Sequence, residues 1–503
     1  MIVKPFPMSL RTYKAVSVLF VFPCVLLFGA MLSPIAPVLP TSQTAKNGVP
    51  PAICASCIRG NMEFLASDAM QGRGSGTHDE LVAATFIAAQ LRAYGIEPAG
   101  DNGGYIQQAT ILRENFTRTP HLSFRLSEKG SPPRVVSWTH GQQFLVVNLS
   151  QADFSGPFQK IDIDAGPLAV KPGAIVFVTG KSVDKVREAA PAFLSQGAVA
   201  VLSPPSRGRL LRWAELGKQL PEVTPQVEGA SPGSGAHFNL IEVNDVARED
   251  LAKVPDGTIL HFHGMTAPQK KDSTWNVIGT IKGSDEMLGK RAILFSAHLD
   301  HLGIGAPVKG DRIYNGADDD ASGVIAVLEL ARVLGLGPPP KRSVYFVLFG
   351  SEEEGGLGST YFREHLPVPL EDLDAMLEFE MIGRADPAVA RDTLWLTGWE
   401  RSNLGLELAA HGAALVGDPH PAEDFFQRSD NYVFAKKGVV AQTISSYGMH
   451  NDYHQPSDDI AHLDFEHMDE AIASLIKPIE WLVNSDFKPE WKPGQNPQTT
   501  AKP

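Results

Sequence analysis

Blocks of apolar residues alternate with polar ones through the second half of the chain and predict a regular succession of strands and helices. Residues 291–300 (RAILFSAHLD) and 341–354 (KRSVYFVLFGSEEE) each hold one continuous apolar run, as buried strands do. Between them, residues 321–334 (ASGVIAVLELARVL) space their apolar side chains as a buried helix does. Further strands are expected at 272–283, 375–383, 393–398 and 438–445, and further helices at 358–366, 402–415 and 464–483. This alternation predicts an α/β fold whose mainly parallel, mixed sheet is covered by helices on both faces.

The first half of the chain has a less regular pattern. Residues 79–96 show helical spacing and reach Gly95, a helix-stop signal, while residues 105–112 (YIQQATIL) are typical of a strand. Farther on, short strand-like and helix-like runs are separated by Gly- and Pro-rich stretches, which indicates an inserted, β-rich module. The main domain is expected to have an N-terminal part at residues 58–133 and a larger part at residues 272–486. The inserted domain is expected at residues 134–264, and residues 487–503 are expected to form a polar, disordered tail.

The N-terminus has the features of an export signal. An uncharged apolar run at 15–32 follows Lys4, Arg11 and Lys14 and precedes a Pro-rich stretch. An uncleaved single-span anchor is the alternative, because the run approaches the ~20 residues that a membrane helix needs. Pro23 and the prolines that follow favour a cleaved signal. With either interpretation residues 1–45 form a signal or anchor with a linker, and the rest of the chain is exported, either periplasmic or secreted.

Three cysteines are present, and Cys24 lies inside the apolar run. Cys54 and Cys57 lack the second C-x-x-C pair that a four-thiolate zinc site requires. In an oxidising compartment, a short-loop disulfide is the expected fate of this pair.

Length and charge limit the classes of protein that need to be considered. A chain of 503 residues exceeds what one hydrophobic core usually supports, so at least two folded modules are expected. The formal net charge of −13 argues against a nucleic-acid partner, because proteins that bind nucleic acid usually present a basic face. Oligomeric state cannot be deduced from these quantities.

Carboxylates and imidazoles stand where the expected strands end. Strand 291–300 runs into HLDH at residues 298–301, strand 341–354 ends in SEEE, strand 375–383 ends in EMIG, and strand 438–445 leads on to YHQPSDD. The helix at 321–334 is preceded by three consecutive aspartates in NGADDDASG. Because ligands of open α/β sheets bind beyond the carboxyl ends of the strands, these groups are expected to converge. Without cations such a site would repel itself, so bound divalent metals explain it best.

Mixed nitrogen and oxygen ligands point to zinc, with cobalt or manganese as substitutes. One carboxylate can bridge two ions, and one histidine and one carboxylate on each ion would complete two open sites. Between ions about 3.5–4 Å apart, a bridging water is a strong nucleophile near neutral pH. Glu352 and Glu353 are adjacent, so one can bind metal while the other accepts the proton of that water.

Five motifs, AHLDH, NGADDDASG, FGSEEEGGLGS, EMIGR and DYHQPSDD, together resemble the co-catalytic di-zinc exopeptidase family of the peptidase M28 type. They occur in the family's order over residues 276–467. The family includes secreted leucyl aminopeptidases, glutamate carboxypeptidases and, more distantly, glutaminyl cyclases. Residues 134–264 are similar to the protease-associated domain often inserted in these enzymes, and residues 62–77 resemble the family's N-terminal lead-in. Each motif alone is weak evidence, whereas five in order are specific.

The resemblance implies metal ligands at five positions. Asp319 would bridge both zinc ions, with His298 on one ion. Glu353 and His454 would bind the other ion. Glu380 stands where many relatives carry aspartate in a DMIGR motif, and it is the fifth expected ligand.

Three further residues receive roles from the same resemblance. Asp300 would orient the metal-binding imidazole, and Glu352 would be the general base that takes the proton of the water and passes it to the leaving amine. Tyr447 is a candidate for stabilising the oxyanion, although its motif match is loose. The resemblance also implies a cis peptide bond between Asp319 and Asp320.

Other polar residues near the motifs are expected to be structural. Glu354 is expected on a solvated face, and Asp458 and Asp459 are expected to cap the turn that follows them. His301 and His450 are expected to be structural, with the substrate pocket as an alternative location.

Two hydrolase motifs do not apply. Residues 229–233 (GASPG) match the serine-hydrolase pattern G-x-S-x-G, but no strand precedes them and no helix follows. No H-E-x-x-H occurs, which argues against single-zinc helical metalloproteases.

The sequence therefore predicts an exported zinc exopeptidase, most simply an aminopeptidase acting on the N-termini of peptides or proteins, without contact to membranes beyond the N-terminal segment. A carboxypeptidase or glutaminyl cyclase of the same fold and a non-catalytic, receptor-like binding protein are the alternatives. The receptor interpretation is disfavoured because every expected ligand position keeps a ligating side chain.

Overall fold

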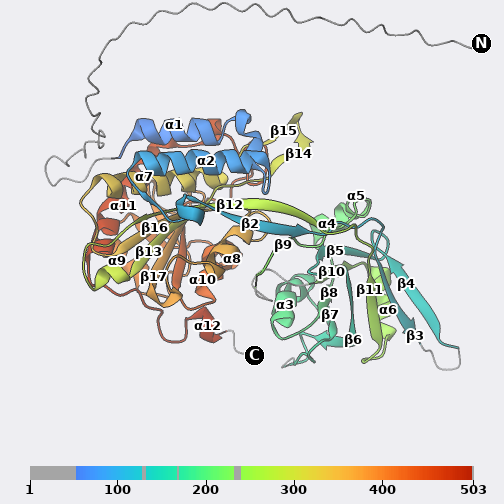
Figure 1. The fold of residues 1–503 in the computed structure, drawn as a ribbon. Coiled ribbons are helices and arrows are strands. Elements are labelled where there is room, and N and C mark those ends of the chain that lie inside the picture. The colour runs from blue at the N-terminus through green and yellow to red at the C-terminus, as the bar shows by residue number, and fades with distance from the viewer. Residues whose placement is uncertain (1–52, 127–131, 167–168, 231–238, 501–503) are drawn as a thin grey trace, which may run out of the picture. The chain divides into compact units, whose positions relative to one another are not determined.

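The computed structural model describes residues 53–126, 132–166, 169–230 and 239–500, and these residues form two large β-sheets (Figure 1). The predicted signal or anchor at residues 1–45 lies outside the described residues, as does Ser231 of the GASPG match. Among the helices of the described ranges, none has the length and apolar character that crossing a membrane requires.

The larger sheet has parallel strands at its centre and antiparallel strands toward its edges. Its order is β19-β18-β20-β17-β13-β16-β12-β2-β9, and β1 pairs with β12. The strands β16, β13, β17 and β20 are mutually parallel, so their carboxyl ends lie along one edge. The strand bounds are β1 Glu97–Pro98, β2 Ile106–Arg113, β9 Gln226–Val227, β12 Lys270–Ile281, β13 Ala292–His298, β16 Ser343–Phe349, β17 Leu373–Phe379, β18 Leu394–Leu396, β19 Leu415–Gly417 and β20 Val440–Ser445.

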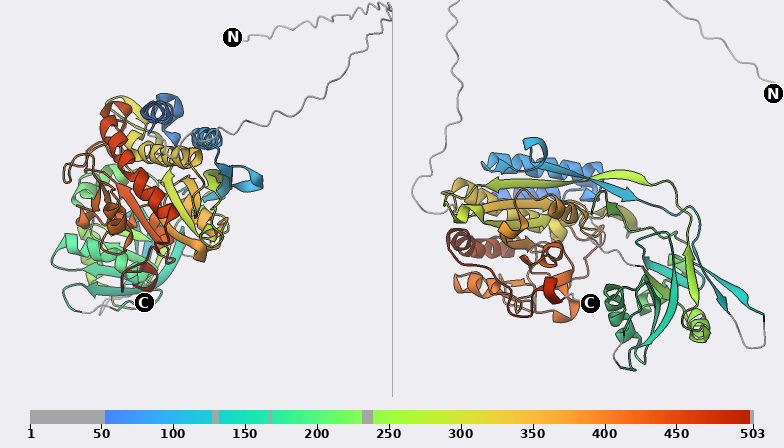
Figure 2. Two further views of the ribbon diagram at one scale, coloured as in Figure 1. Left: turned by 90° about the vertical axis from the view of Figure 1, so that its left-hand side faces the viewer. Right: turned by 60° about the horizontal axis from the view of Figure 1, so that its bottom comes forward.

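Helices cover both faces of this sheet, as the apolar periodicity predicted. On one face, α1, α2 and α11 pack around α7, and the views in Figure 2 show α1 and α2 together on that side. On the other face, α8 and α10 contact each other and the strands β12, β17 and β20. The helix bounds are α1 Ala55–Leu65, α2 His78–Ala93, α7 Gly323–Leu336, α8 Leu357–Glu364, α9 Leu404–Ala410, α10 Asn431–Ala435 and α11 Phe465–Asn484.

The smaller sheet contains eight strands in the order β4-β3-β11-β6-β7-β8-β10-β5. Its strands β6, β7, β8 and β10 are parallel, and it has its own apolar cores. The bounds are β3 His121–Leu126, β4 Arg134–Thr139, β5 Phe144–Asn148, β6 Asp153–Asp162, β7 Ile175–Thr179, β8 Ala200–Ser203, β10 Leu240–Val243, β11 Ile259–His263, α3 Val183–Ser195, α4 Arg207–Leu211, α5 Trp213–Leu216 and α6 Asp245–Lys253.

The smaller sheet extends beyond the expected insertion, and one segment of the insertion leaves it. Strand β3 pairs with β4 and β11, so the smaller sheet includes residues before position 134. Strand β9 pairs instead with β2 at the edge of the larger sheet. Whether the insertion is a protease-associated domain stays a prediction.

The C-terminal residues 487–500 are not disordered, contrary to expectation. Trp491 donates a hydrogen bond from Nε1 to the carbonyl of Gly438 at 3.0 Å, and Glu490 pairs through its backbone with Asn403. The rings of Trp491 and Phe487 pack against the core of the larger sheet. These aromatic anchors outweigh the polar, Pro-rich composition of the segment. A short helix, α12 (Pro497–Thr500), ends the described chain.

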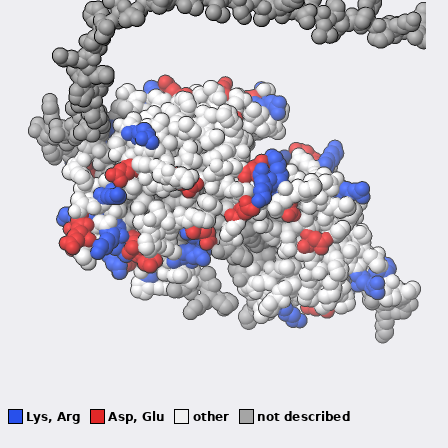
Figure 3. Space-filling model, viewed as in Figure 1, with Lys and Arg blue, Asp and Glu red and all other residues white. Residues whose placement is uncertain are grey.

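The pair Cys54–Cys57 forms a disulfide, which confirms the expected pairing. It lies at the start of α1, and the N–H of Cys54 donates to Glu329 of the central helix α7. On the face shown in Figure 3, acidic and basic residues are intermixed, so the described surface in that view carries no broad field of one sign.

Candidate metal centre

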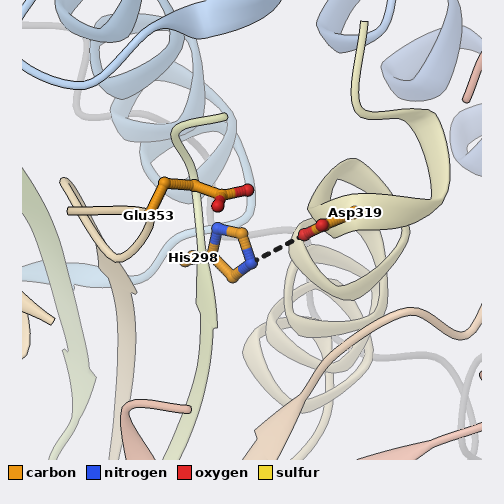
Figure 4. Close-up of side chains that lie close together, drawn as sticks. All are labelled: His298, Asp319 and Glu353. Atoms are coloured by element: carbon orange, nitrogen blue, oxygen red, sulfur yellow. Dashed lines mark ion pairs between the residues drawn. The ribbon is translucent and has the colours of Figure 1, made fainter. Parts of the chain in front are cut away.

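The site lies at the carboxyl ends of the four parallel strands, where the sequence placed it. His298 is the last residue of β13, and Glu380 follows β17 directly. Glu353 lies in the turn after β16, and His454 lies in the loop after β20. Asp319 comes from the segment that enters α7 and faces His298 (Figure 4).

Asp319 stands between two imidazoles. Its Oδ1 lies 3.1 Å from Nε2 of His298, and its Oδ2 lies 3.2 Å from Nε2 of His454. The two carboxylate oxygens therefore face different ligand candidates, which is the arrangement that a bridging carboxylate needs. His298, Asp319 and Glu353 each offer one ligand atom within 4.8 Å of the others.

Glu353 completes the second side of the cluster. Its Oε2 lies 3.2 Å from Nε2 of His454, and its Oε1 lies 2.6 Å from Nδ1 of His301. His301 is fully buried and also lies 3.9 Å from Oδ2 of Asp319. The structure therefore places His301 inside the cluster. The sequence already gave a signal for this, because His301 belongs to the same HLDH strand end as His298.

The other two aspartates of the run bind backbone groups. Asp320 accepts hydrogen bonds from the N–H groups of His298, Gly323 and Met381 at 3.0–3.2 Å. Asp318 accepts one from Gly383 at 2.7 Å. Both side chains are fully buried, and the expected cis peptide bond joins Asp319 to Asp320.

Two glycines allow this crowded entry into α7. Gly316 has a φ of 61°, and a Cβ there would lie 2.2 Å from the carbonyl oxygen of Asp319. A Cβ on Gly323 would lie 2.3 Å from the carbonyl oxygen of Phe379. Side chains at either position would push the aspartates away from the strand ends.

Asp458 fixes the aspartate run from the opposite side. Its carboxylate accepts hydrogen bonds from the N–H groups of Asp318 and Asp319, both at 3.0 Å. The expectation that Asp458 caps a turn is therefore wrong, whereas Asp459 does cap the short helix after it by accepting from the N–H of Ala461. The physical reason is that Asp458 is buried against the aspartate run, whereas Asp459 is partly exposed at the turn.

Arg384 and His450 tie the loop that carries His454 to the aspartate run. Arg384 Nη1 lies 2.7 Å from Asp452, and its Nη2 lies 3.3 Å from Asp458. His450 Nε2 lies 2.9 Å from Asp318 Oδ2. His450 therefore contacts the aspartate run, and its structural role stays a prediction.

Asp300 holds the neighbouring site elements through hydrogen bonds. Its Oδ1 accepts from the N–H of Glu352 at 3.0 Å, and its Oδ2 accepts from Ser75. His298 Nδ1 lies 3.2 Å from the carbonyl oxygen of Asp300 and 3.8 Å from its Oδ1. A proton on Nδ1 donated to that carbonyl leaves the lone pair of Nε2 directed at the centre of the cluster.

The electrostatic environment of the cluster stabilises positive charge. Burial alone would raise the pKa of Asp319, but His301, His298 and His454 hold it well below the usual range. Burial likewise opposes the charged form of His454, yet its hydrogen bonds to Asp319 and Glu353 raise its pKa to about 10. The raised pKa of His454 shows that this environment stabilises a positive charge, which a bound metal dication would supply in place of the proton.

Buried polar atoms without hydrogen bonds support the same conclusion. Within the described residues, Nε2 of His298, both ring nitrogens of His301 and Oε1 of Glu353 make none. His301 Nδ1 and Glu353 Oε1 are close, but their directions do not fit a hydrogen bond. Buried polar atoms without hydrogen bonds are costly in a protein interior unless they bind an ion. The donor set of imidazoles and carboxylates fits zinc.

Glu352 and Glu380 are partly buried at the rim of this cluster. Burial raises the pKa of Glu352 well above its ordinary value, and nearby Asp430, Glu380 and Glu353 raise it further. Burial and the charge of Asp319 also raise the pKa of Glu380. Neither residue belongs to the closest three-residue group, so the role of Glu380 as ligand stays a prediction.

Beside Glu380 a pocket opens that is lined by aromatic side chains. Trp395, Phe425, Tyr447 and Tyr453 form its walls. Tyr447 is largely buried, and burial raises the pKa of its hydroxyl, which keeps it protonated and able to donate a hydrogen bond.

Three non-glycine residues around the site have left-handed backbone conformations. Ser351, Met381 and His454 have φ values of 52°, 53° and 56°. Such conformations are uncommon for side-chain-bearing residues and cluster at functional sites. Each of these residues is a candidate ligand or the chain neighbour of a candidate site residue.

The structure also corrects the expectation for Glu354. This residue is not on a solvated face, since its carboxylate lies 2.7 Å from Arg113 and its side chain is only 25% exposed. Burial raises the pKa of Glu354 despite that partner. Sequence reasoning missed this contact because Arg113 lies in a distant strand.

Sequence comparison relates the chain to known peptidases. Residues 276–477 match peptidase family M28. The chain is 26% identical over 235 residues to aminopeptidase YwaD of Bacillus subtilis, covering 45% of this chain and 51% of that protein. It is 30% identical over 219 residues to the probable leucine aminopeptidase 2 of Aspergillus oryzae, covering 42% of this chain and 41% of that protein. The chain thus spans about half, or less, of the length of these curated relatives.

Solved structures resemble the whole described chain only loosely. An aminopeptidase from Aneurinibacillus sp. strain AM-1 aligns with a TM-score of 0.49 at 20% identity, over 88% of this chain and 95% of that one. A zinc aminopeptidase from Bacillus subtilis aligns with a TM-score of 0.46 at 18% identity, over 87% and 97%. All of the candidate site residues lie inside residues 276–477, the range that matches peptidase family M28.

Proposed function

We propose that the protein is an exported zinc-dependent exopeptidase, specifically an aminopeptidase that hydrolyses the N-terminal peptide bond with two zinc ions. The observation that carries this proposal is the position of Asp319, whose two oxygens face His298 on one side and His454 on the other. A carboxylate shared in this way suits a two-ion site.

The chain's own residues divide into two ligand sets around Asp319. His298 and Glu380 would hold one ion, and Glu353 and His454 the other. Ions bound there would supply Lewis acidity to polarise the scissile carbonyl and lower the pKa of a water. Asp300 would hold His298 in the orientation that presents Nε2.

Glu352 is the proposed proton carrier. Its backbone is fixed by the hydrogen bond to Asp300, and its pKa is raised by burial and by neighbouring carboxylates. A carboxylate with a raised pKa takes a proton from the attacking water more readily than an ordinary one and then donates it to the leaving amine. Tyr447, protonated and facing the pocket, would donate to the developing oxyanion.

The surplus of buried carboxylates favours a free amine over a free carboxylate at the site. Glu380 lines the aromatic pocket and Glu352 lines the neighbouring cavity, so in their ionised forms they would attract a substrate ammonium and repel a carboxylate. The aromatic pocket beside Glu380 would then receive the side chain of the terminal residue.

Carboxypeptidase activity is the second candidate, because Arg428 lines both this aromatic pocket and the neighbouring cavity that includes Glu352. An arginine there could bind an α-carboxylate in bidentate fashion. In the structure Arg428 lies over the ring of Phe425 at 4.8 Å and 3.8 Å from Glu423, which partly compensates its charge.

Export is supported by two features. The basic, apolar and Pro-rich segments of the first 45 residues follow the order of a signal or anchor. The Cys54–Cys57 disulfide suits an oxidising compartment.

The test is a comparison of free-amine and N-blocked peptides with the purified chain, with zinc counted and then removed by a chelator. We expect about two zinc ions per chain, cleavage of free-amine peptides only, and loss of activity on chelation that zinc restores. Cleavage of N-blocked peptides from the carboxyl end would favour the carboxypeptidase instead. Activity that survives chelation would refute the mechanism.

A further inference from the structure

A groove lies next to the metal centre and is built jointly by the two sheets. It has a volume of about 390 Å³, within the roughly 300–1,000 Å³ typical of ligand sites. One wall consists of residues 146–148 at the end of β5 and residues 221–225, and the other of Glu353, Glu354 and Gly355. Glu353 is thus both a candidate metal ligand and part of the groove.

The wall from the insertion is fastened to the larger sheet by backbone hydrogen bonds. Directly after residues 221–225 the chain forms β9, whose Val227 pairs with Ile111 of β2. The N–H of Val223 donates to the carbonyl of Glu114 at 3.3 Å, and the N–H of Thr224 donates to the carbonyl of Leu149 at 2.7 Å. Because these bonds connect both sheets, the groove exists before a ligand binds, which lowers the entropic cost of binding.

The lining of the groove suits an uncharged stretch of peptide. Val147 is 40% exposed, and Pro221 and Pro225, which lie on either side of the buried Val223, add apolar surface. Oδ1 of Asn148 is buried and has no hydrogen-bond partner among the described residues, so it can accept from a peptide N–H.

The charges of the groove disfavour a free carboxylate end. Its described lining residues include Glu222, Glu353 and Glu354 but neither Lys nor Arg. Glu354 is paired with Arg113, whereas Glu222 is exposed. A peptide that ended inside this groove would bring its C-terminal carboxylate against these acids, whereas a longer chain would pass through it.

We propose that this groove binds the part of the substrate that follows the scissile bond. The enzyme would then act preferentially on peptides in which several residues follow the N-terminal residue of the substrate. This proposal rests on the proposed aminopeptidase function. In an aminopeptidase only one residue precedes the scissile bond, so the rest of the peptide must extend from the metal centre in one direction. The aromatic pocket beside Glu380 receives the terminal side chain, and the groove that shares Glu353 with the metal centre receives the remainder.

The test compares the zinc-loaded full chain on leucine anilide and on C-terminally amidated, leucine-headed dipeptide, tetrapeptide and hexapeptide. We expect kcat/KM to rise by about tenfold or more from dipeptide to hexapeptide, the size of effect that one or two pocket contacts supply. A kcat/KM that is independent of length would overturn the proposal. Failure to cleave even the anilide would instead refute the proposed function, so the two failures are distinguishable.

Variants locate the effect. Val147→Asp and Asn148→Leu should each lower kcat/KM for the hexapeptide about tenfold and leave the anilide unchanged. Val135→Asp is the matched control, because Val135 lies in β4 of the same sheet, is 67% exposed and does not line the groove. Equal effects on anilide and hexapeptide, or equal effects of the control, would contradict the assignment. The length series on the unmodified chain decides the question even if a variant fails to fold.

Discussion

The two runs of three acids, Asp318–Asp320 and Glu352–Glu354, meet at the same site but use their charges differently. In the aspartate run all three side chains are buried, and two of them accept hydrogen bonds from backbone N–H groups of neighbouring segments. Only the middle one, Asp319, faces imidazoles with both oxygens. Two of these short side chains therefore fix the backbone of the loop, and Asp319 remains as the candidate metal ligand.

The glutamate run sends each side chain to a different neighbour. Glu352 lines a cavity, Glu353 meets His301 and His454, and Glu354 pairs with Arg113. The longer side chains reach away from their own backbone, so the turn itself is held by other groups, such as Asn276, which accepts from the N–H of Gly350. The comparison shows two ways in which a run of like charges can be stabilised. The carboxylates can accept hydrogen bonds from backbone N–H groups, or they can point to different partners.

The largest effect is expected where the runs meet the ligand cluster. Asp319→Ala removes the carboxylate that both His298 and His454 face. Zinc content should fall, and kcat/KM should drop by more than the roughly 10–100-fold that loss of a residue merely supporting a ligand costs. Metal analysis and kinetics on the folded variant check this. A variant that keeps its full complement of zinc would show that Asp319 is not a ligand.

The next effect separates proton transfer from metal binding. Glu352→Gln keeps the size of the side chain but removes the base. We expect kcat to fall by about 10²–10⁴-fold while the zinc content stays unchanged. Loss of zinc in this variant would place Glu352 among the ligands instead, and a rate within tenfold of the original would refute its role.

A third variant tests whether the aspartate run stabilises the fold. Asp320→Ala removes the acceptor of three buried N–H groups, from His298, Gly323 and Met381. The free energy of unfolding should decrease by about 3 kcal/mol or more, because each buried donor left unsatisfied costs roughly 1–3 kcal/mol. Urea unfolding measures the change. Asp459→Ala, which removes a partly exposed cap, should cost only about 1 kcal/mol.

The smallest effect is expected at the dispersed end of the glutamate run. Glu354→Gln breaks the pair with Arg113, but both side chains are partly exposed, and burial already raises the pKa of Glu354. Stability should change by about 1 kcal/mol or less, with zinc content and anilide hydrolysis unchanged. A large loss of zinc would mean that the two runs do not divide their roles as described.

Most of the central architecture could be predicted because the information is local. Apolar runs and helical spacing identified the parallel strands and α7, and the shared direction of those strands placed their polar ends together. His298, Asp319, Glu353 and His454 do meet in the structure. Binding of zinc by these residues stays a prediction.

The remainder depends on contacts between residues far apart in the sequence, for which no local signal exists. Asp458 binds backbone groups of Asp318 and Asp319, and Arg113 neutralises Glu354 from another strand. The C-terminal segment is held by the hydrogen bond from Trp491 to the carbonyl of Gly438, a residue 53 positions earlier in the chain. The composition of this segment shows only that it is polar, and it does not reveal this contact.

The pairing of β9 with β2 limits how far the protein can be divided into modules. A cut at the boundaries of the insertion would remove β9, leaving Ile111 and Leu112 without their backbone partners at the edge of the larger sheet. It would also remove Val227 from the apolar cluster it shares with Leu357 of α8, which begins just after the glutamate turn. A minimal catalytic fragment should therefore retain residues 222–228 or a substitute strand. In protein design, the insertion and the larger sheet are therefore better treated as one unit.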